Sequence, residues 1–215
     1  MSPGRVRAMI SAGRLRGERP NRDLFVDPDD VLRILKEPRN AGRHLSARSC
    51  WRLLMLAEGI VAGESSREEQ RRDRARLAAL PDLEPGVLAA RASTHQLVGN
   101  RGVLHHLLED SRVVLGGLSA AAQYGADIVG GGLAEGYADA SALSALLRDY
   151  ALSSKPLGEP ANVIIRVPEP QWPFQQGAKY APAAVVGADL IDHGDERSVR
   201  AGRLLISSLV SPTRS

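Results

Sequence analysis

The chain has 215 residues, of which 43% are hydrophobic and 25% charged. This is the composition of a folded globular protein with one large or two small cores. No apolar run is long enough to cross a membrane, and the start has no signal-peptide pattern, so no membrane partner and a cytoplasmic location are expected. The single cysteine, Cys50, excludes an intrachain disulfide and a cysteine-rich zinc site.

Charge divides the chain into two unequal parts. Residues 1–80 carry 17 Lys and Arg against 11 Asp and Glu, whereas residues 81–215 carry 11 against 14. A basic half joined to an acidic half is typical of a protein in which one domain meets nucleic acid. Nearly all the basic residues are arginine, a bias that a GC-rich genome also produces, so the abundance of arginine alone indicates nothing about phosphate.

The first thirty residues predict a helix, a hairpin and a second helix. Ser2 is a good N-cap, and Pro3 suits the first helical position. One narrow apolar stripe follows at helical spacing, formed by Val6, Met9 and Ile10. Gly13 is placed to end this helix. Two short strands flank a turn at Pro20–Asn21, and residues 28–30 open a helix over residues 31–35. The order is that of the latter part of a winged helix-turn-helix.

The stretch SPGRVRAMISAGRL resembles the recognition helix and wing of MerR/excisionase-type DNA-binding domains. The resemblance implies a helix in the major groove of double-stranded DNA and a wing on the phosphate backbone. The expected DNA-binding residues are Arg5, Arg7 and Arg14 in or beside the groove, and Arg16, Arg19 and Arg22 on the wing. The pattern begins at the first residue, so we expect the preceding helix of the family to lie upstream or to be replaced by a partner or a later helix. The alternative is a basic surface helix and hairpin without a ligand.

Two helices are predicted between residues 46 and 80. Ser46 caps the first, which runs past Trp51 to Gly59 and is apolar enough to be buried. The second follows a capping box at residues 65–69 and is highly charged. Its mixed-sign pairs favour a solvated face, with phosphate contacts by Arg71, Arg72, Arg74 and Arg76 as the alternative. We therefore expect a DNA-binding module at 1–45, a helical linker at 46–80 and a further domain at 81–215.

Short strands and helices alternate in residues 81–215. Helices are predicted from Pro85 to about His95 and near 103–108, and strands at 112–115, 135–138 and 162–168. Further helices are predicted at 142–150, 183–191 and 196–209, the last with a core side of Val199, Leu204, Leu205 and Leu209. His105 and His106 are adjacent on a helix and are expected to face different directions, so no metal site is predicted. The fold class is α+β, mostly helical, with a C-terminal α/β domain.

The strand before Gly116-Gly117-Leu118-Ser119 raises the possibility of nucleotide chemistry. In nucleotidyltransferases such a turn approaches a triphosphate, and paired carboxylates hold magnesium. Asp127 lacks a paired carboxylate here, and Asp139 comes too late in the chain to supply it. Phosphate-binding loops and dinucleotide-binding glycine motifs are also missing. We therefore predict no catalytic activity, cofactor or metal, with a degenerate nucleotidyltransferase-like protein as an alternative.

Residues 112–209 resemble the C-terminal domain of AbiEi-type antitoxins and related actinobacterial transcriptional regulators. The matching pieces are RVVLGGLSAAAQYG, NVIIRVP, the WPF loop and APAAVVGADLIDHGDERSVRAGRLLISSL. The resemblance implies a sequence-specific DNA-binding repressor of its own toxin–antitoxin operon, with a nucleotidyltransferase-like toxin as possible partner. We expect a homodimer on an inverted repeat. The competing hypothesis is a toxin-neutralising protein-interaction module that lacks specific DNA binding.

Overall fold

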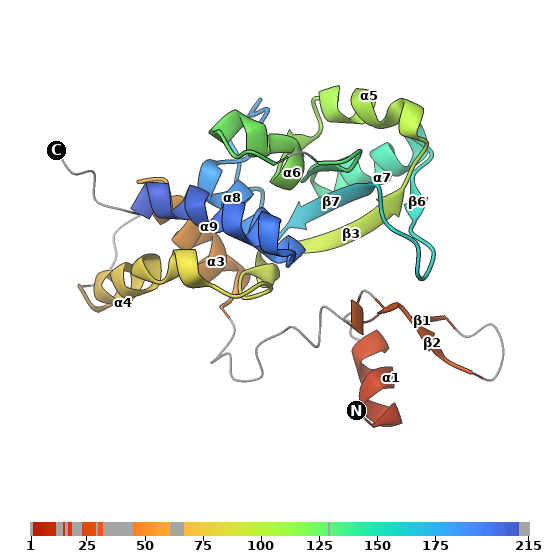
Figure 1. Ribbon diagram of the computed structural model, residues 1–215, viewed down its shortest axis with the longest axis horizontal. Coiled ribbons are helices and arrows are strands. Elements are labelled where there is room, and N and C mark those ends of the chain that lie inside the picture. Colours follow the sequence, from red (N-terminus) through yellow and green to blue (C-terminus); the bar gives the residue numbers. More distant parts are fainter. Residues whose placement is uncertain are drawn as a thin grey trace.

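The computed structural model describes residues 2–11, 15, 17–18, 23–28, 30–31, 45–60, 67–128 and 130–210. In this part of the chain the fold is α+β, with eight α-helices, a two-stranded hairpin and a five-stranded mixed sheet. Figure 1 shows the N-terminal helix and hairpin below the sheet domain, set apart from its helices. None of the described helices combines the length and apolar character that a membrane span requires.

The N-terminal helix and hairpin form as predicted. Helix α1 (Pro3–Ser11) begins after Ser2, whose Oγ accepts a hydrogen bond from the Arg5 amide at 3.4 Å. Strands β1 (Gly17–Glu18) and β2 (Phe25–Val26) pair antiparallel. Met9 of α1 is buried. The chain is helical again at Pro28, Asp30 and Val31. Four of the predicted features lie outside the described residues: the helix end at Gly13, the turn at 20–21, the body of the second helix and the linker at 37–44.

The five-stranded sheet has the order β4-β5-β7-β3-β6. Its strands are β3 (Ala92–Val98), β4 (Val114–Leu115), β5 (Ala134–Tyr137), β6 (Ser153–Ser154) and β7 (Val163–Pro168). Strands β5 and β7 run parallel, and the other three pairs are antiparallel. The sheet is therefore mixed and has one parallel pair of strands near its centre. A sheet built from βαβ units would have several parallel pairs.

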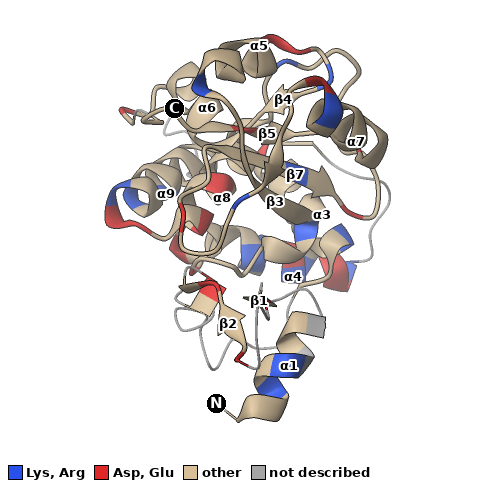
Figure 2. Cartoon of the chain, turned by 90° about the vertical axis from the view of Figure 1, so that its right-hand side faces the viewer, with Lys and Arg blue, Asp and Glu red and all other residues tan. Residues whose placement is uncertain are grey.

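Helices cover both faces of this sheet, with α8 and α9 on one side and α7 on the other (Figure 2). From residue 45 on, the described α-helices are α3 (Ala47–Ala57), α4 (Arg67–Ala78), α5 (Leu104–Glu109), α6 (Gly117–Ala120), α7 (Ala140–Asp149), α8 (Ala183–His193) and α9 (Glu196–Val210). Short 3-10 turns are η1 (Leu80–Asp82), η2 (Ala89–Arg91), η3 (Arg101–Val103) and η4 (Ala121–Tyr124). The predicted cap of α3 is present at Ser46, and Asp139 and Asp195 cap α7 and α9.

The prediction of a helix from Pro85 to about His95 is wrong. Residues 89–91 form only the turn η2, and the chain then enters β3. Strand β3 pairs with β7 over six consecutive residues and with β6 at its far end. The helix prediction came mainly from a proline at a favourable starting position. Hydrogen bonding to strands that are distant in the sequence overrides this local preference.

Helix α9 buries a different side from the one predicted. Its buried residues are Ser198, Gly202, Leu205 and Ile206, whereas Leu204 is 64% exposed. Leu204 was expected in the core, but it lies about 100° around the helix from Leu205 and faces out. The buried side carries Gly202, where an added Cβ would meet the carbonyl oxygen of Gly187 in α8. The two helices therefore touch through their backbones.

Helix α3 belongs to the core of the sheet domain. Cys50, Trp51 and Leu54 are buried in the same hydrophobic cluster as the sheet residues. Burial raises the pKa of the Cys50 thiol to about 11, which suits a packing role. Helix α4, by contrast, buries none of its residues. The domain boundary placed after residue 80 stays a prediction, and it does not coincide with an edge of this hydrophobic core.

The α8–α9 contact predicts the effect of Gly202→Ala. Alanine favours a helix over glycine by about 1 kcal/mol, but its methyl group would collide with the Gly187 carbonyl. We expect a net loss of about 1–3 kcal/mol in the free energy of unfolding, measured by urea denaturation. Arg200→Ala, at an exposed position of the same helix, is the control and should change stability little. Unchanged or increased stability of Gly202→Ala would contradict the close approach.

Candidate functional site

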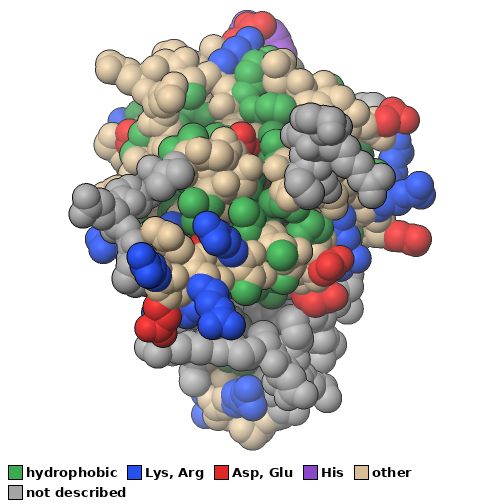
Figure 3. Space-filling model, turned by 90° about the vertical axis from the view of Figure 1, so that its left-hand side faces the viewer, with side chains coloured by type: hydrophobic (Ala, Val, Ile, Leu, Met, Phe, Trp, Pro, Cys, Tyr) green, Lys and Arg blue, Asp and Glu red, His purple; other side chains and the backbone are tan. Residues whose placement is uncertain are grey.

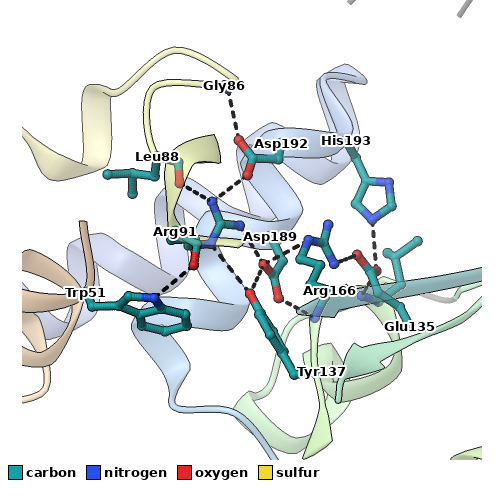
Figure 4. A network of polar contacts seen from close by, with 12 residues as sticks. Trp51, Gly86, Leu88, Arg91, Glu135, Tyr137, Arg166, Asp189, Asp192 and His193 are labelled. Atoms are coloured by element: carbon teal, nitrogen blue, oxygen red, sulfur yellow. Dashed lines mark hydrogen bonds and ion pairs between the residues drawn. The ribbon is translucent and has the colours of Figure 1, made fainter. Parts of the chain in front are cut away.

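A network of buried polar residues lies between the sheet and α8, as Figure 4 shows. Its members come from segments far apart in the chain: Trp51, Arg91, Glu135, Tyr137, Arg166, Asp189, Asp192 and His193. Tyr137 and Arg166 are partners in the pairing of β5 with β7. The three α8 residues are spaced i, i+3 and i+4, so they share one side of that helix. We call this set the buried ionic cluster.

The Asp189 carboxylate is the centre of the cluster. It is fully buried and accepts hydrogen bonds from Arg91 Nη2 at 2.6 Å and from Tyr137 Oη at 2.5 Å, both at Oδ1. Arg166 Nε lies 3.6 Å from the same oxygen. The other oxygen accepts the amide of Gly117 at 3.0 Å. One carboxylate therefore joins α8 to η2, to two central strands and to the start of α6.

Arg91 connects the cluster to α3 and to the segment before β3. Its Nη1 donates to the Leu88 carbonyl at 2.9 Å and lies 2.7 Å from Asp192 Oδ2. Its own carbonyl oxygen accepts a hydrogen bond from Trp51 Nε1 at 2.9 Å. Burial alone would lower the pKa of the Arg91 guanidinium, but the nearby Asp192, Tyr137 and Asp189 outweigh it and raise this pKa. The side chain stays charged.

Glu135 forms the second half of the cluster. Its Oε1 lies 2.5 Å from Arg166 Nη1, and its Oε2 accepts the Leu118 amide at 2.8 Å and lies 2.9 Å from His193 Nε2. Burial raises the pKa of the Glu135 carboxyl, but Arg166 and His193 outweigh burial and hold it below its usual range. Burial lowers the pKa of His193, and the hydrogen bond and charge of Glu135 reverse that shift. His193 therefore keeps its proton to a higher pH than an ordinary histidine does.

The charges of the cluster balance when His193 is protonated. Arg91, Arg166 and protonated His193 face the carboxylates of Glu135, Asp189 and Asp192. Most of these side chains are almost fully enclosed, and only Asp192 and His193 reach the surface, with 19% and 15% exposure. Because the acids and bases are paired with one another inside the protein, the arrangement suits holding elements together better than acting on a substrate.

The Gly116–Gly117 turn is occupied by the cluster. The amides of Gly117 and Leu118, which would face a triphosphate in a nucleotidyltransferase, donate to the Asp189 and Glu135 carboxylates. Gly117 has a positive φ of 45°, and a Cβ there would overlap the Glu135 carboxylate. The turn needs glycines here because it packs directly on the protein's own carboxylates.

The other candidates for chemistry have structural partners as well. Ser119 Oγ accepts the Glu135 amide at 2.9 Å, and Asp139 caps α7. His105 and His106 were expected to face different directions, but their ring centroids lie 3.7 Å apart. Within the described segments, no three or more His, Cys, Asp or Glu side chains are grouped to hold a metal ion.

Sequence reasoning missed every charged member of the cluster, although a signal was present. Arg166 interrupts the apolar strand VIIRVP, and Asp189 interrupts the apolar helix AAVVGADLI. A charged residue inside an apolar segment needs a buried partner of opposite charge. The signal identifies such residues but not which of them pair, because partners such as Arg91 and Asp189 lie 98 positions apart.

The predicted DNA-binding residues can be placed only in part. Arg5 and Arg7 are exposed on α1, where Figure 2 shows basic residues along the helix. Arg14, Arg16, Arg19 and Arg22 lie outside the described residues. Just after the hairpin, Asp27 is buried and lies 3.2 Å from Lys155 Nζ of the sheet domain. This buried ion pair fastens the N-terminal segment to the loop that follows β6.

Comparisons of the chain with protein-family models, with curated proteins and with solved structures gave no match. The two resemblances drawn from the sequence therefore stay predictions.

The occupied glycine turn predicts a large effect for Gly117→Ala. A positive φ costs a non-glycine residue about 1–2 kcal/mol, and displacing the Glu135 carboxylate would leave buried partners unsatisfied at a further cost of about 1–3 kcal/mol. Gly131→Ala is the matched control, because φ is also positive there but an added Cβ meets no atom within 4 Å. Urea denaturation should show the larger loss for Gly117→Ala. Equal losses would mean that only backbone strain matters.

The raised pKa of His193 predicts a pH-dependent stability. Its protonated form stabilises the fold fully below the ordinary histidine pKa of 6.5, and this stabilisation is lost as pH rises through the higher folded-state pKa. The free energy of unfolding should therefore differ most between wild type and His193→Gln at acidic pH, and the difference should shrink on going to alkaline pH. The control is His95→Gln, because burial lowers the pKa of His95 and reverses the trend. A pH-independent difference for His193→Gln would contradict the assignment.

Proposed function

We propose that the chain is a DNA-binding transcriptional regulator whose α1 and hairpin contact double-stranded DNA as a winged helix-turn-helix does. The observation that carries the proposal is the two-sided character of α1. Met9 is buried and Val6 and Ile10 are half-buried, whereas Arg5 and Arg7 are exposed. A short helix held by its apolar side and basic on its outer side fits the major groove.

The hairpin beside α1 is suited to the role of a wing. Its strand β1 packs on the helix, because a Cβ added at Gly17 would come within 2.6 Å of Ile10 Cδ1. Helix and hairpin therefore form one small unit, and Arg16, Arg19 and Arg22 belong to the hairpin segment in the sequence. Arginines on a wing would hold the phosphate backbone while residues early in the helix read bases.

The sheet domain would act as the body that carries this unit. The Asp27–Lys155 ion pair attaches the unit to the domain, and the buried ionic cluster holds the domain's own elements together. The resemblance to AbiEi-type antitoxins supports a further part of the proposal: a homodimer on an inverted repeat that represses its own toxin–antitoxin operon. A nucleotidyltransferase-like toxin would then be encoded beside it.

DNA titrations test this function. Full-length protein is titrated by fluorescence polarisation against its own upstream DNA and a scrambled duplex, at two salt concentrations. We expect Arg5→Ala to change the preference between the duplexes, because an early helix residue reads bases. Arg19→Ala should weaken binding to both duplexes about equally, because it loses a phosphate contact. For the same reason the slope of log affinity against log salt concentration should fall by about 1.

The control is Arg148→Ala, which removes an exposed arginine of α7 and should leave both affinities unchanged. Equal, weak and salt-sensitive binding to both duplexes by the wild-type protein would contradict a specific regulator. Binding that survives both Arg5→Ala and Arg19→Ala would show that the DNA-binding residues were wrongly assigned.

A further inference from the structure

The outer side of α9 exposes an apolar residue among arginines. Leu204 is the most exposed of the large hydrophobic side chains that the described part of the chain leaves open to solvent. Arg200 precedes it by one helical turn and is also exposed. In Figure 2, α9 lies at the margin of the molecule, so nothing drawn in that view stands outside it. Residues four apart on a helix are neighbours, so Arg200 and Leu204 form one ridge.

A hollow lies on each side of this ridge. The larger one, of about 550 Å³, lies between α9 and the segment that follows α6, and it is lined by Tyr124, Ala126, Asp127, Arg197, Ala201 and Leu205. The smaller one, of about 360 Å³, is lined by Glu196, Val199, Arg203 and Ser207. Arg200 and Leu204 line both hollows. A ridge between two grooves is the surface that a second helix packs against.

The charged side chains of α9 itself are mainly basic. Helix α9 carries three arginines and one acidic residue, Glu196. Arg197 donates to the Asp127 carbonyl at 3.1 Å, and Arg203 lies 3.6 Å from Glu84. Within the described residues, no hydrogen bond or ion pair engages Arg200. The ridge therefore presents an exposed leucine beside a guanidinium that is available to an acidic group.

We propose that the outer side of α9 is a docking surface for an amphipathic helix of a partner protein, one with an apolar stripe flanked by acidic side chains. The apolar stripe would cover Leu204 and enter the two hollows, as in helix-in-groove recognition. Carboxylates at its edges would pair with Arg200 and Arg197. Figures 1 and 2 both place α9 away from α1, so this surface is separate from the proposed DNA-binding unit.

Charge and polarity favour this occupant over two others. A second copy docked through its own α9 would bring six arginines together with two glutamates, which is repulsive. Nucleic acid would suit the arginines but would leave Leu204 and the apolar lining against a charged backbone. On the adjoining face, toward which the C-terminal end of α9 points, hydrophobic side chains again lie beside basic ones (Figure 3). A partner helix with both apolar and acidic side chains therefore also suits this adjoining face.

The test uses full-length protein and two fluorescein-labelled synthetic peptides of about 20 residues, long enough to form helix. Both carry the same leucine stripe; one has glutamates at its edges and the other has lysines. We expect the glutamate peptide to bind at least about tenfold more tightly than the lysine peptide. Leu204→Glu and Arg200→Glu should each weaken binding of the glutamate peptide about tenfold or more. Arg200→Glu should also bind the lysine peptide better than wild type does.

Ile60→Glu is the matched control, because it changes a different exposed hydrophobic residue and should leave peptide binding intact. Circular dichroism should show that all three variants fold, since each site is at the surface. Equal affinity for the two peptides, or wild-type affinity in Leu204→Glu, would overturn the proposal. So would a concentration-dependent dimer that Leu204→Glu abolishes, or a loss of DNA binding in Arg200→Glu, since these outcomes assign the surface to a second copy or to nucleic acid.

Discussion

The fold of the sheet domain depends on the buried carboxylate of Asp189. It accepts from Arg91 and Tyr137 and from the amide of Gly117, and Arg166 stands beside it. An unpaired carboxylate in such a place would be very costly, so its partners must all be in position when α8 docks on the sheet. The contacts are made only if η2, β5, β7 and α6 are placed correctly. One side chain thus couples the correct arrangement of five elements.

Glu135 repeats this arrangement a short distance away, with Arg166 shared between the two carboxylates. The balance of charges explains how so many ionised groups are tolerated in a core. It also explains the glycines at 116 and 117, because carboxylates that accept backbone amides must approach the chain closely. A turn that suggests nucleotide binding in the sequence is thus filled by the protein's own acids. A saturated, enclosed cluster of this kind favours rigidity, and rigidity suits a domain that orients a separate binding unit.

Among the described residues, two exposed surfaces are suited to interaction with other molecules. Helix α1 is basic, and its neighbouring hairpin supplies further arginines in the sequence, which fits a polyanion. The outer side of α9 combines Leu204 with arginines, which fits a protein with mixed character. Because the two surfaces lie on different elements, DNA and a partner protein would not compete directly. Within the part of the chain that the structure describes, the Asp27–Lys155 contact is one connection between the N-terminal unit and the sheet domain.

The sequence by itself determined the features that depend on neighbouring residues. The caps at Ser46, Asp139 and Asp195, the strand at 163–168, the solvated helix α4 and the short N-terminal helix and hairpin all follow from local chemistry and spacing. Tertiary structure alone decided that residues 92–98 form a strand, because β7 supplies its hydrogen-bond partners from about seventy positions away. It also decided that Leu204 faces solvent, since the glycine contact between α8 and α9 sets which side of α9 is buried. Tertiary structure also decided the buried ionic cluster. The sequence shows charged residues within apolar segments, but only the fold places each acidic side chain beside its basic partner.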